Sequence, residues 1–411
     1  MHAKSSNRRR FLKSGATLGA ALVEVARAGP AAQSPPGRPA VEPAAPADPT
    51  KAPGVLARPY GERSRFEKVV RTPSPQGTSS GTPLQELQGI ITPSALHFER
   101  HHAGVPDIDP RRHRLMIHGM VDHPLIFTME ELKRLPSVSR IYFIECSGNG
   151  YRRRDAATLQ EAHGLTSCSE WTGVLLSLLL REAGVQKGAS WLVAEGSDAA
   201  KMTRSIPLKK ALDDVLVAYG QNGEALRPEQ GYPLRLVVPG WEGNICVKWL
   251  RRIKVVDQPY MTREETSKYT DLMPDGKARQ FSLEMDPKSV ITFPSGGHKL
   301  PAAGFYEITG LAWSGRGAIS KVEISTDGGN TWRPAELQEP VLRLAHTRFR
   351  FAWQWDGRET ILQSRCTDEN GDVQPTLAEL VQARGENWGY HFNPIQSWRV
   401  AADGSVHNVA G

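Results

Sequence analysis

The sequence predicts an α+β domain followed by an all-β sandwich. From about residue 91 to 258, β-rich runs interleave with short helical patterns, which is typical of an α+β domain. Further on, short alternating stretches are separated by Asp/Gly turns and show no helical period, as in a β-sandwich. A chain of 411 residues is long enough for both. The predicted domains are 91–284 and 285–411.

Residues 1–28 resemble a bacterial twin-arginine export signal. Arg8 and Arg9 precede a weakly apolar stretch, and Ala26-Arg27-Ala28 has the form of a small-x-small cleavage site. We therefore expect export to the periplasm. Because this pathway moves folded proteins, the signal also suggests a cofactor that is inserted before export.

Two segments connect this signal to the first domain. Residues 29–60 are rich in Pro and Ala and lack the side chains for a core, so we expect a disordered linker. Residues 61–90 remain rich in Gly, Ser and Pro, and we expect an irregular lead-in that is only partly docked.

Charge and hydropathy exclude two broad classes of protein. Residues 1–28 carry six basic side chains and one acidic one, so most of the net charge of +7 lies there. The nearly neutral remainder predicts no nucleic-acid partner. No run of about 20 apolar residues is present, so we expect no membrane span.

The elements of the first domain follow from local patterns. The Thr128–Glu131 pair forms a capping box that opens a short helix ending before Pro136. Residues 172–184 have an apolar pattern closed by glycine and predict a second helix. Asn222-Gly223 predicts a hairpin turn. Further strands are expected at 114–119, 140–146, 191–194, 234–238 and 247–256, with a loop at 147–150.

The sandwich elements are expected from strict alternation of apolar and polar residues. Its tryptophans are expected in the core. The expected strands are 306–313, 321–326, 348–355 and 361–367.

Four widely spaced cysteines limit the metal chemistry. Without a C-x-x-C pair, the chain has no Cys₄ zinc or iron–sulfur site and no c-type haem site. Cys146 stands out because it ends a predicted strand before small residues, a position that presents the sulfur to a cleft. A thiolate there is a soft metal ligand and a nucleophile. The alternative for each cysteine is a small buried apolar side chain.

Basic residues lie upstream and downstream of Cys146 in the sequence, and gathered near its thiolate they would suit an anionic ligand, since arginine binds oxyanions through paired hydrogen bonds. They lie at 97–102, 151–154, 231–235 and 247–249.

Six motifs, in order over about residues 90–410, resemble the sulfite oxidase family of molybdenum enzymes. They are 98–110 (FERHHAGVPDIDP), 144–149 (IECSGN), 171–174 (WTGV), 217–226 (VAYGQNGEAL), 231–240 (GYPLRLVVPG) and 247–252 (VKWLRR). The resemblance implies a molybdopterin domain followed by an immunoglobulin-like sandwich in the position of the family's dimerisation domain.

The same resemblance implies a molybdenum–molybdopterin cofactor, with the metal held by two dithiolene sulfurs, oxo groups and one protein cysteine. Cys146 occupies that cysteine position. The residues implied to contact the cofactor are Phe98, His102, Asp198, Arg235 and Lys248. Those implied on the substrate side are Arg100, Arg152, Trp171 and Tyr269.

Three stretches (97–110, 145–150 and 268–277) resemble most the molybdenum subunits of sulfane (sulfite) dehydrogenases of the Sox thiosulfate-oxidation system. This implies oxidation of a sulfane- or sulfite-level sulfur by oxygen-atom transfer, with electrons passed to a c-type cytochrome subunit. It also implies a partner protein that carries the sulfur on a cysteine. A homodimer or a heterotetramer is expected.

Three departures from the family pattern concern the substrate pocket. Gly150-Tyr151 stands in place of an arginine pair, Gln230 in place of a histidine, and residues 387–393 lack an arginine. A pocket short of two arginines is expected to bind free sulfite less tightly and to favour a bulkier, carrier-bound sulfur.

Alternatives remain open for several residues and for the function. His101, His102 and His113 could be surface histidines, and the arginines at 152–154 a solvated charge run. Trp171 could be a core aromatic, and Tyr269 a loop anchor. The functional alternatives are a direct dehydrogenase of free sulfite, an exported molybdenum reductase of sulfoxide type, and a non-enzymatic binding module.

Overall fold

The computed structural model describes residues 57–386 and 388–409. The chain divides into two units, Met1–Ser64 and Arg65–Gly411. In the first unit only residues 57–64 are described, and they are exposed, without helix or strand. The predicted export signal and most of the predicted linker lie outside the described residues. No helix in the described part of the chain is long and apolar enough to cross a bilayer.

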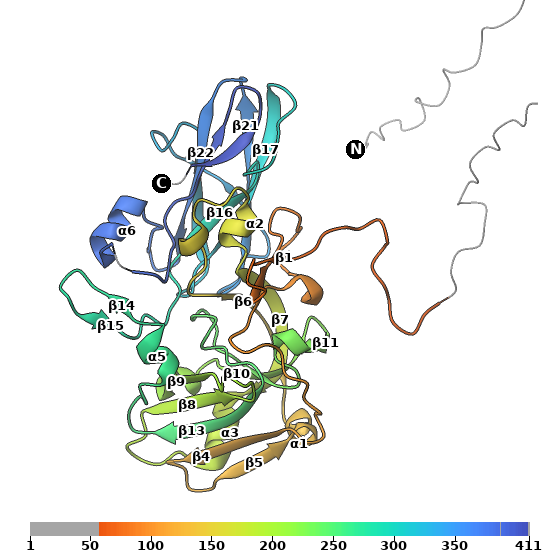
Figure 1. The fold of residues 1–411 in the computed structure, drawn as a ribbon, viewed down its shortest axis with the longest axis vertical. Coiled ribbons are helices and arrows are strands. Elements are labelled where there is room, and N and C mark those ends of the chain that lie inside the picture. The colour runs from red at the N-terminus through yellow and green to blue at the C-terminus, as the bar shows by residue number, and fades with distance from the viewer. Residues whose placement is uncertain (1–56, 387, 410–411) are drawn as a thin grey trace, which may run out of the picture. The chain divides into compact units, whose positions relative to one another are not determined.

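Two five-stranded sheets form the first domain (Figure 1). The first sheet is antiparallel and consists of β6 (Val138–Glu145), β7 (Thr166–Leu175), β10 (Leu216–Gln221), β11 (Glu224–Ala225) and β12 (Arg235–Val237). The second has one parallel pair, β4–β13, and consists of β4 (Arg114–Gly119), β5 (Leu125–Thr128), β8 (Trp191–Gly196), β9 (Thr203–Pro207) and β13 (Leu250–Val256).

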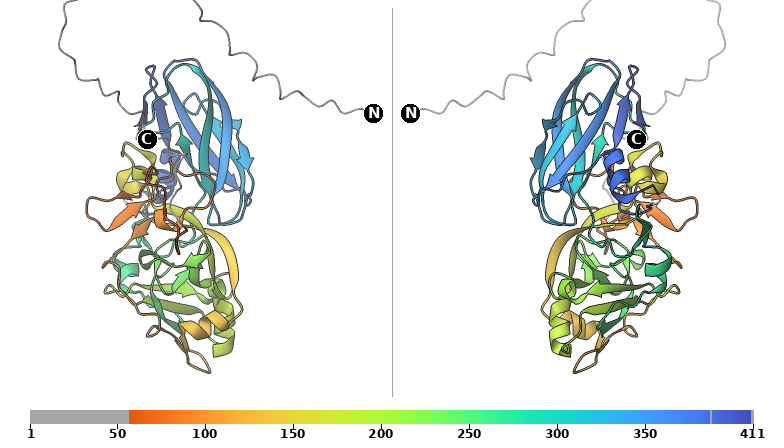
Figure 2. Two further views of the ribbon diagram at one scale, coloured as in Figure 1. Left: turned by 90° about the vertical axis from the view of Figure 1, so that its right-hand side faces the viewer. Right: turned by 90° about the vertical axis from the view of Figure 1, so that its left-hand side faces the viewer.

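The sandwich domain consists of two antiparallel sheets, which stand as two layers in Figure 2. One sheet contains β16 (Lys288–Phe293), β17 (Gly304–Trp313), β20 (Glu336–Gln338) and β21 (Thr347–Trp355). The other contains β18 (Ile319–Ser325), β19 (Arg333–Pro334), β22 (Thr360–Asp368), β23 (Ser397–Val400) and β24 (Val406–Val409). The predicted fold class is therefore confirmed, and the predicted alternating strands lie in β17, β18, β21 and β22.

Short elements complete the described chain. The α-helices are α1 (Met129–Arg134), α2 (Leu159–His163), α3 (Leu176–Ala183), α4 (Leu208–Ala211), α5 (Arg263–Ser267) and α6 (Leu377–Arg384). The 3₁₀ helices are η2 (Ser94–Leu96), η3 (Tyr151–Arg153) and η4 (Pro228–Gln230). Two further small sheets pair β1 (Thr72–Pro73), β2 (Ser79–Gly81) and β3 (Glu99–Arg100), and β14 (Asp271–Leu272) with β15 (Ala278–Arg279).

Local signals in the sequence predicted several of these elements correctly. The capping box of Thr128 and Glu131 opens α1. The turn at Asn222 and Gly223 joins β10 to β11, and both residues have the positive φ that a type I′ hairpin needs.

The helix predicted at 172–184 was wrong in its first part. Strand β7 continues to Leu175, and only Leu176–Ala183 is helical. The strand is hydrogen-bonded on both sides, to β6 and to β10, so sheet pairing overrides the helical pattern. Gly173 permits the close approach of β10, because a Cβ there would lie 2.2 Å from the Val217 carbonyl oxygen.

The lead-in is more ordered than the sequence suggested. Its short strands β1 and β2 extend to β3, and Leu84 is buried in the core of the sandwich. Arg348 of β21 fastens it by donating hydrogen bonds to the carbonyl oxygens of Leu87 and Gly89.

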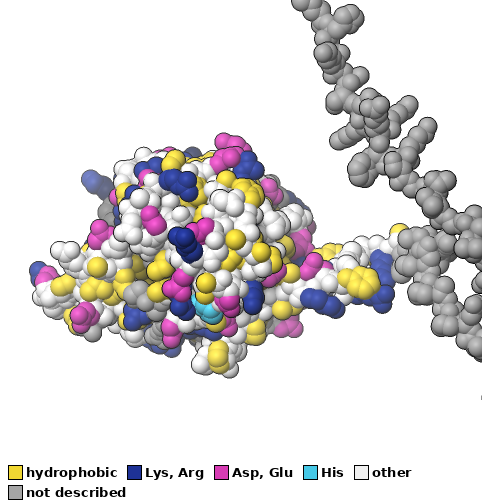
Figure 3. All heavy atoms as spheres, turned by 90° about the horizontal axis from the view of Figure 1, so that it is seen from above, with side chains coloured by type: hydrophobic (Ala, Val, Ile, Leu, Met, Phe, Trp, Pro, Cys, Tyr) yellow, Lys and Arg dark blue, Asp and Glu magenta, His cyan; other side chains and the backbone are white. Residues whose placement is uncertain are grey.

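The two domains have separate cores. Buried residues between 98 and 255 form one cluster. The sandwich forms the second, which also includes Phe143, Leu159 and Cys168 of the first domain. Seen from above, the surface carries charges of both signs among hydrophobic side chains, with no large patch of one sign on that face (Figure 3).

Candidate functional site

Two adjoining cavities meet where strand β6 ends. The first encloses about 680 Å³ and the second about 1230 Å³, both in part open to solvent. They share Arg100, His102, Cys146 and Tyr269. Each of these residues was predicted from the sequence, and they come from three distant segments, so the fold gathers them around the Cys146 sulfur.

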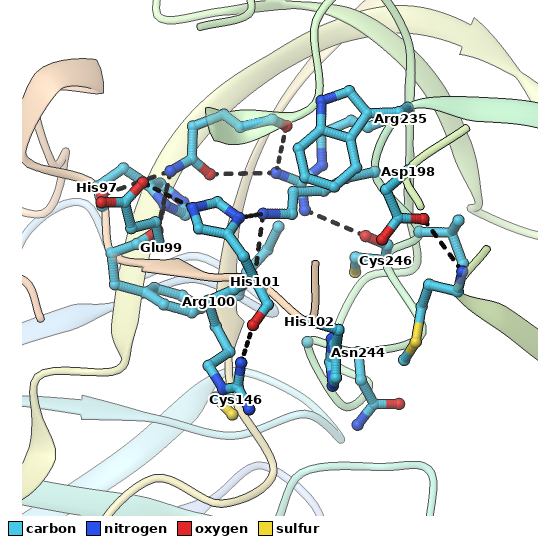
Figure 4. Close-up of a pocket in the computed structure, with 18 of the residues that line it drawn as sticks. His97, Glu99, Arg100, His101, His102, Cys146, Asp198, Arg235, Asn244 and Cys246 are labelled. Carbon is cyan, nitrogen blue, oxygen red and sulfur yellow. Dashed lines mark hydrogen bonds and ion pairs between the residues drawn. The ribbon is translucent and has the colours of Figure 1, made fainter. Parts of the chain in front are cut away.

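The first cavity also contains the other residues predicted for the cofactor, namely Phe98, Asp198, Arg235 and Lys248. In Figure 4, Cys146 lies beside Arg100 at one end of the cavity, and Arg235 and Asp198 lie toward the other. A volume of this size is in the range of sites that take a cofactor-sized ligand. The cavity thus has a sulfur at one end and a cation at the other.

Arg235 is a buried cation without a carboxylate partner among the described residues. It donates from Nη1 to the Gln230 carbonyl oxygen at 2.9 Å and from Nη2 to that of Cys246 at 3.3 Å. Its guanidinium lies 4.7 Å from the ring centre of Trp171. Its Nε is buried without a hydrogen-bond partner. Burial lowers the pKa of Arg235 to about 10, and an anion would relieve this cost.

Lys248 is the second cation of this cavity. Its Nζ donates to the carbonyl oxygens of Arg100 at 3.2 Å and Glu229 at 2.9 Å, and to Nδ1 of His101 at 2.9 Å. Because His101 accepts there, its Nε2 carries the proton and donates to Glu99 at 2.9 Å. Burial and, to a smaller extent, the charge of Arg235 lower the pKa of Lys248 to about 7.

Cys146 presents a half-buried thiol to both cavities. Its backbone N–H donates to the Leu165 carbonyl oxygen, and its own carbonyl accepts from the N–H of Asn149, both at 2.9 Å. Burial raises the pKa of the Cys146 thiol, against the opposing effects of the Gly148 N–H and the Arg100 charge. A soft metal ion would displace this thiol proton.

Tyr269 forms a wall between the cavities. Its hydroxyl lies 3.3 Å from Nε2 of His102, and its ring centre lies 5.2 Å from that of Tyr390. The guanidinium of Arg204 lies 4.8 Å from the Tyr269 ring centre. Burial raises the pKa of Tyr269, and Cys146 raises it further, so the phenol keeps its proton. Tyr269 therefore lines both cavities in addition to any role in anchoring its loop.

Of the residues predicted on the substrate side, Trp171 needs a correction, and Arg152 stays untested. Trp171 is fully buried and lines neither cavity; its Nε1 donates to the Tyr142 carbonyl oxygen at 3.2 Å. Its position fits the alternative of a core aromatic that supports Arg235. The side chain of Arg152 lies outside the described part of the chain. The neighbouring Arg153 lines the second cavity.

The departure at Gly150 and Tyr151 has a structural explanation. Gly150 has a φ of 100°, and a Cβ there would lie 2.8 Å from Phe392 and 2.9 Å from His163. The ring of Tyr151 packs against Trp388 and Phe392, at centre distances of 5.4 and 6.0 Å. Aromatic side chains occupy this region instead of two cations.

The second departure from the family pattern is Gln230 in place of a histidine. Gln230 joins Arg235 to Phe98 through hydrogen bonds. Its Nε2 donates to the Phe98 carbonyl oxygen at 2.9 Å, and its own oxygens accept from Arg235. Gln230 also lines the first cavity, so it belongs to the site although it replaces the family's histidine.

A buried polar network beneath the loop was missed by the sequence analysis. Arg204 pairs with Glu242 at 3.5 Å and with Glu265 at 3.4 Å, and His391 lies 2.8 Å from Glu242. The backbone N–H of His391 donates to the carbonyl oxygen of Ser147, next to Cys146, at 2.8 Å. These residues come from separate segments, so no local motif could have revealed them.

The sequence analysis predicted Cys146 as the protein ligand of the metal. Within residues 57–386 and 388–409, no three His, Cys, Asp or Glu side chains are grouped so that they could hold a metal ion.

Comparison with known families identifies both domains. Residues 102–264 match the model of the oxidoreductase molybdopterin binding domain, and residues 279–397 match that of the Mo-co oxidoreductase dimerisation domain. The predicted resemblance is therefore confirmed.

Relatives and solved structures agree with this assignment. The chain is 30% identical to mouse mitochondrial sulfite oxidase over 80% of this chain, and 34% identical to the NADH nitrate reductase of Volvox carteri over 76% of this chain. It spans 65% of the mouse enzyme and 41% of the algal one. It is also similar to the sulfane dehydrogenase SoxCD from Paracoccus pantotrophus, with 48% identity, a TM-score of 0.84, and coverage of 87% of this chain and 95% of that one. The chain belongs to the sulfite oxidase family of molybdenum enzymes.

Proposed function

We propose that this chain is the molybdenum subunit of an exported sulfur dehydrogenase. It oxidises a sulfane- or sulfite-level sulfur by oxygen-atom transfer and passes the electrons to a c-type cytochrome partner. The observation that carries the proposal is the 48% identity to a sulfane dehydrogenase over 95% of that chain, together with the thiol at the meeting point of two cavities.

The residues of the first cavity fit a molybdopterin. The unpartnered Nε of Arg235 and the lowered pKa of Lys248 mark two cations that no carboxylate of the described residues contacts as an ion pair, and a cofactor phosphate would supply that contact. Phe98, His102 and Asp198 would line the pterin, and the Cys146 thiolate would bind the metal. When bound, this cofactor supplies the oxygen-atom and two-electron chemistry.

The chain's own residues bind and orient the substrate. Arg100, Arg153 and Lys268 line the second cavity. Glu161 also lines it and pairs with Arg153 at 3.9 Å, so the cavity keeps a net positive charge, which attracts an anionic sulfur group. Tyr269 keeps its proton and offers a hydrogen bond beside Cys146.

The partners follow from what the sequence lacks and from the relatives. This sequence has no C-x-x-C-H motif for haem, so we expect an external electron acceptor, and the resemblance to Sox sulfane dehydrogenases implies a c-type cytochrome. The dimerisation-domain match supports a homodimer or a heterotetramer. Export to the periplasm and a sulfur-carrier partner belong to the same proposal.

Cytochrome c reduction tests the proposal with two substrates, free sulfite and a carrier protein loaded with a cysteine-linked sulfane. We expect a higher kcat/KM with the loaded carrier. Lys268→Ala should lower kcat/KM for the carrier, whereas the matched control Lys187→Ala, an exposed lysine in neither cavity, should not. Rapid turnover of free sulfite at low concentration would favour the sulfite dehydrogenase instead. Reduction of a sulfoxide without sulfur oxidation would favour the reductase.

A further inference from the structure

The carboxylate of Glu145, the residue before Cys146, is held by three side-chain donors. Its Oε1 accepts from Nζ of Lys288 at 3.0 Å and from Nδ2 of Asn149 at 2.9 Å. Its Oε2 accepts from Nε1 of Trp313 at 2.7 Å. Both oxygens of this carboxylate therefore have fixed partners.

Two of the three donors belong to the sandwich domain. Lys288 begins strand β16 and Trp313 ends β17, and the two residues are directly paired in the sheet. Lys288 and Glu145 are each 1% exposed, and Trp313 is fully buried. An ion pair this deep inside the protein is shielded from solvent and from salt.

The same contacts fix the far end of the Cys146 loop. Nζ of Lys288 also lies 3.4 Å from the carbonyl oxygen of Asn149, and the N–H of Asn149 donates to the carbonyl oxygen of Cys146. The N–H of Gly243 donates to the carbonyl oxygen of Glu145 at 2.6 Å. Lys288 thus contacts both residues that flank the loop bearing the thiol.

We propose that Lys288 is a positioning residue, through which the sandwich domain fixes the Cys146 loop and neutralises the carboxylate beside the Cys146 sulfur. The inference rests on the proposed function where it concerns the metal, but the part that concerns the loop does not need a metal. Without Lys288 the loop would lose its charged link to the sandwich, although Trp313 would still donate to Glu145, and an uncompensated negative charge would remain next to the sulfur. A negative charge at that place disfavours the reduced metal.

The test compares full-length Lys288→Met, Lys288→Arg and the control Arg348→Met with the natural chain. Arg348 is also a buried cation of the sandwich, but it donates to the carbonyl oxygens of Leu87 and Gly89, away from the loop. The first readout is hydrogen exchange of the amides of residues 145–149. The second is the reduction potential of the metal and the electron paramagnetic resonance spectrum of its one-electron state.

We expect Lys288→Met to raise amide exchange in the loop by about tenfold or more, the effect of losing a charge-assisted hydrogen bond. It should also lower the reduction potential and change the spectrum. Lys288→Arg should restore the loop exchange and the properties of the metal in part. Arg348→Met should change neither the loop exchange nor the metal. The proposal would be overturned if folded Lys288→Met showed the same loop exchange and the same spectrum as the natural chain.

A second pair of variants covers the case in which Lys288→Met does not fold. Glu145→Gln with Lys288→Gln and Glu145→Gln with Lys288→Leu both lack a buried charge, and only the first keeps a donor at position 288. We expect slower loop exchange in the first; equal exchange would overturn the proposal. Because exchange is measurable without metal, a natural chain that lacks molybdenum would refute the proposed function and leave this test in place.

Discussion

Lys248 should make cofactor binding depend on pH. Burial and the charge of Arg235 lower its pKa from 10.5 to about 7, and a bound phosphate would raise it again. Binding therefore takes up a proton above pH 7, and affinity falls as pH rises. The fall is at most about tenfold per pH unit, so affinity at pH 9 should be about a hundredfold lower than at pH 6, or about 2.7 kcal/mol.

The assay titrates apo-protein with molybdopterin released from another molybdenum enzyme and follows tryptophan quenching. Trp249 is a suitable reporter, because it lines the first cavity and its ring centre lies 4.5 Å from Nζ of Lys248. Lys248→Arg keeps a charge that does not titrate in this range and should remove most of the pH dependence. Lys248→Met should bind weakly at every pH. Parallel pH profiles for Lys248→Arg and the natural chain would refute the reasoning.

Three further substitutions test the structural account. Gly150→Ala places a Cβ at positive φ against two rings and should lower the free energy of unfolding by about 1–3 kcal/mol; an unchanged melting temperature would contradict this. Arg204→Met leaves Glu242 and Glu265 buried without their cation and should cost about 3–5 kcal/mol in denaturant unfolding, a loss that a wild-type midpoint would disprove. Trp171→Phe loses one hydrogen bond, worth about 1 kcal/mol, and should leave the substrate KM unchanged, since the residue lines neither cavity. A raised KM would indicate that Trp171 acts on the substrate side, as the sequence predicted.

Sequence could predict the parts of the site whose residues lie in contiguous motifs. The segment around residues 98–102, Cys146 and its small neighbours, and Lys248 each lie in a short run whose residue types indicate their chemistry. Local signals also sufficed for the capping box of α1 and for the Asn222-Gly223 turn, because both depend on residues close in sequence.

What sequence could not predict depends on tertiary pairing. Residues 172–175 form a strand despite their helical pattern, because strand β7 is hydrogen-bonded to β6 on one side and to β10 on the other. The Lys288–Glu145 ion pair joins residues 143 positions apart, and neither residue carries a local signal. Trp171 lies in a family motif, but a motif cannot show which face of a strand its side chain takes.

The most direct test of the central claim is X-ray absorption at the molybdenum edge, comparing the purified natural chain with Cys146→Ser. The account predicts molybdenum and pterin in equal amounts in the natural chain, and one sulfur ligand fewer in the variant, with loss of turnover. A natural chain without molybdenum, or a variant with the same sulfur count and the same turnover, would contradict it.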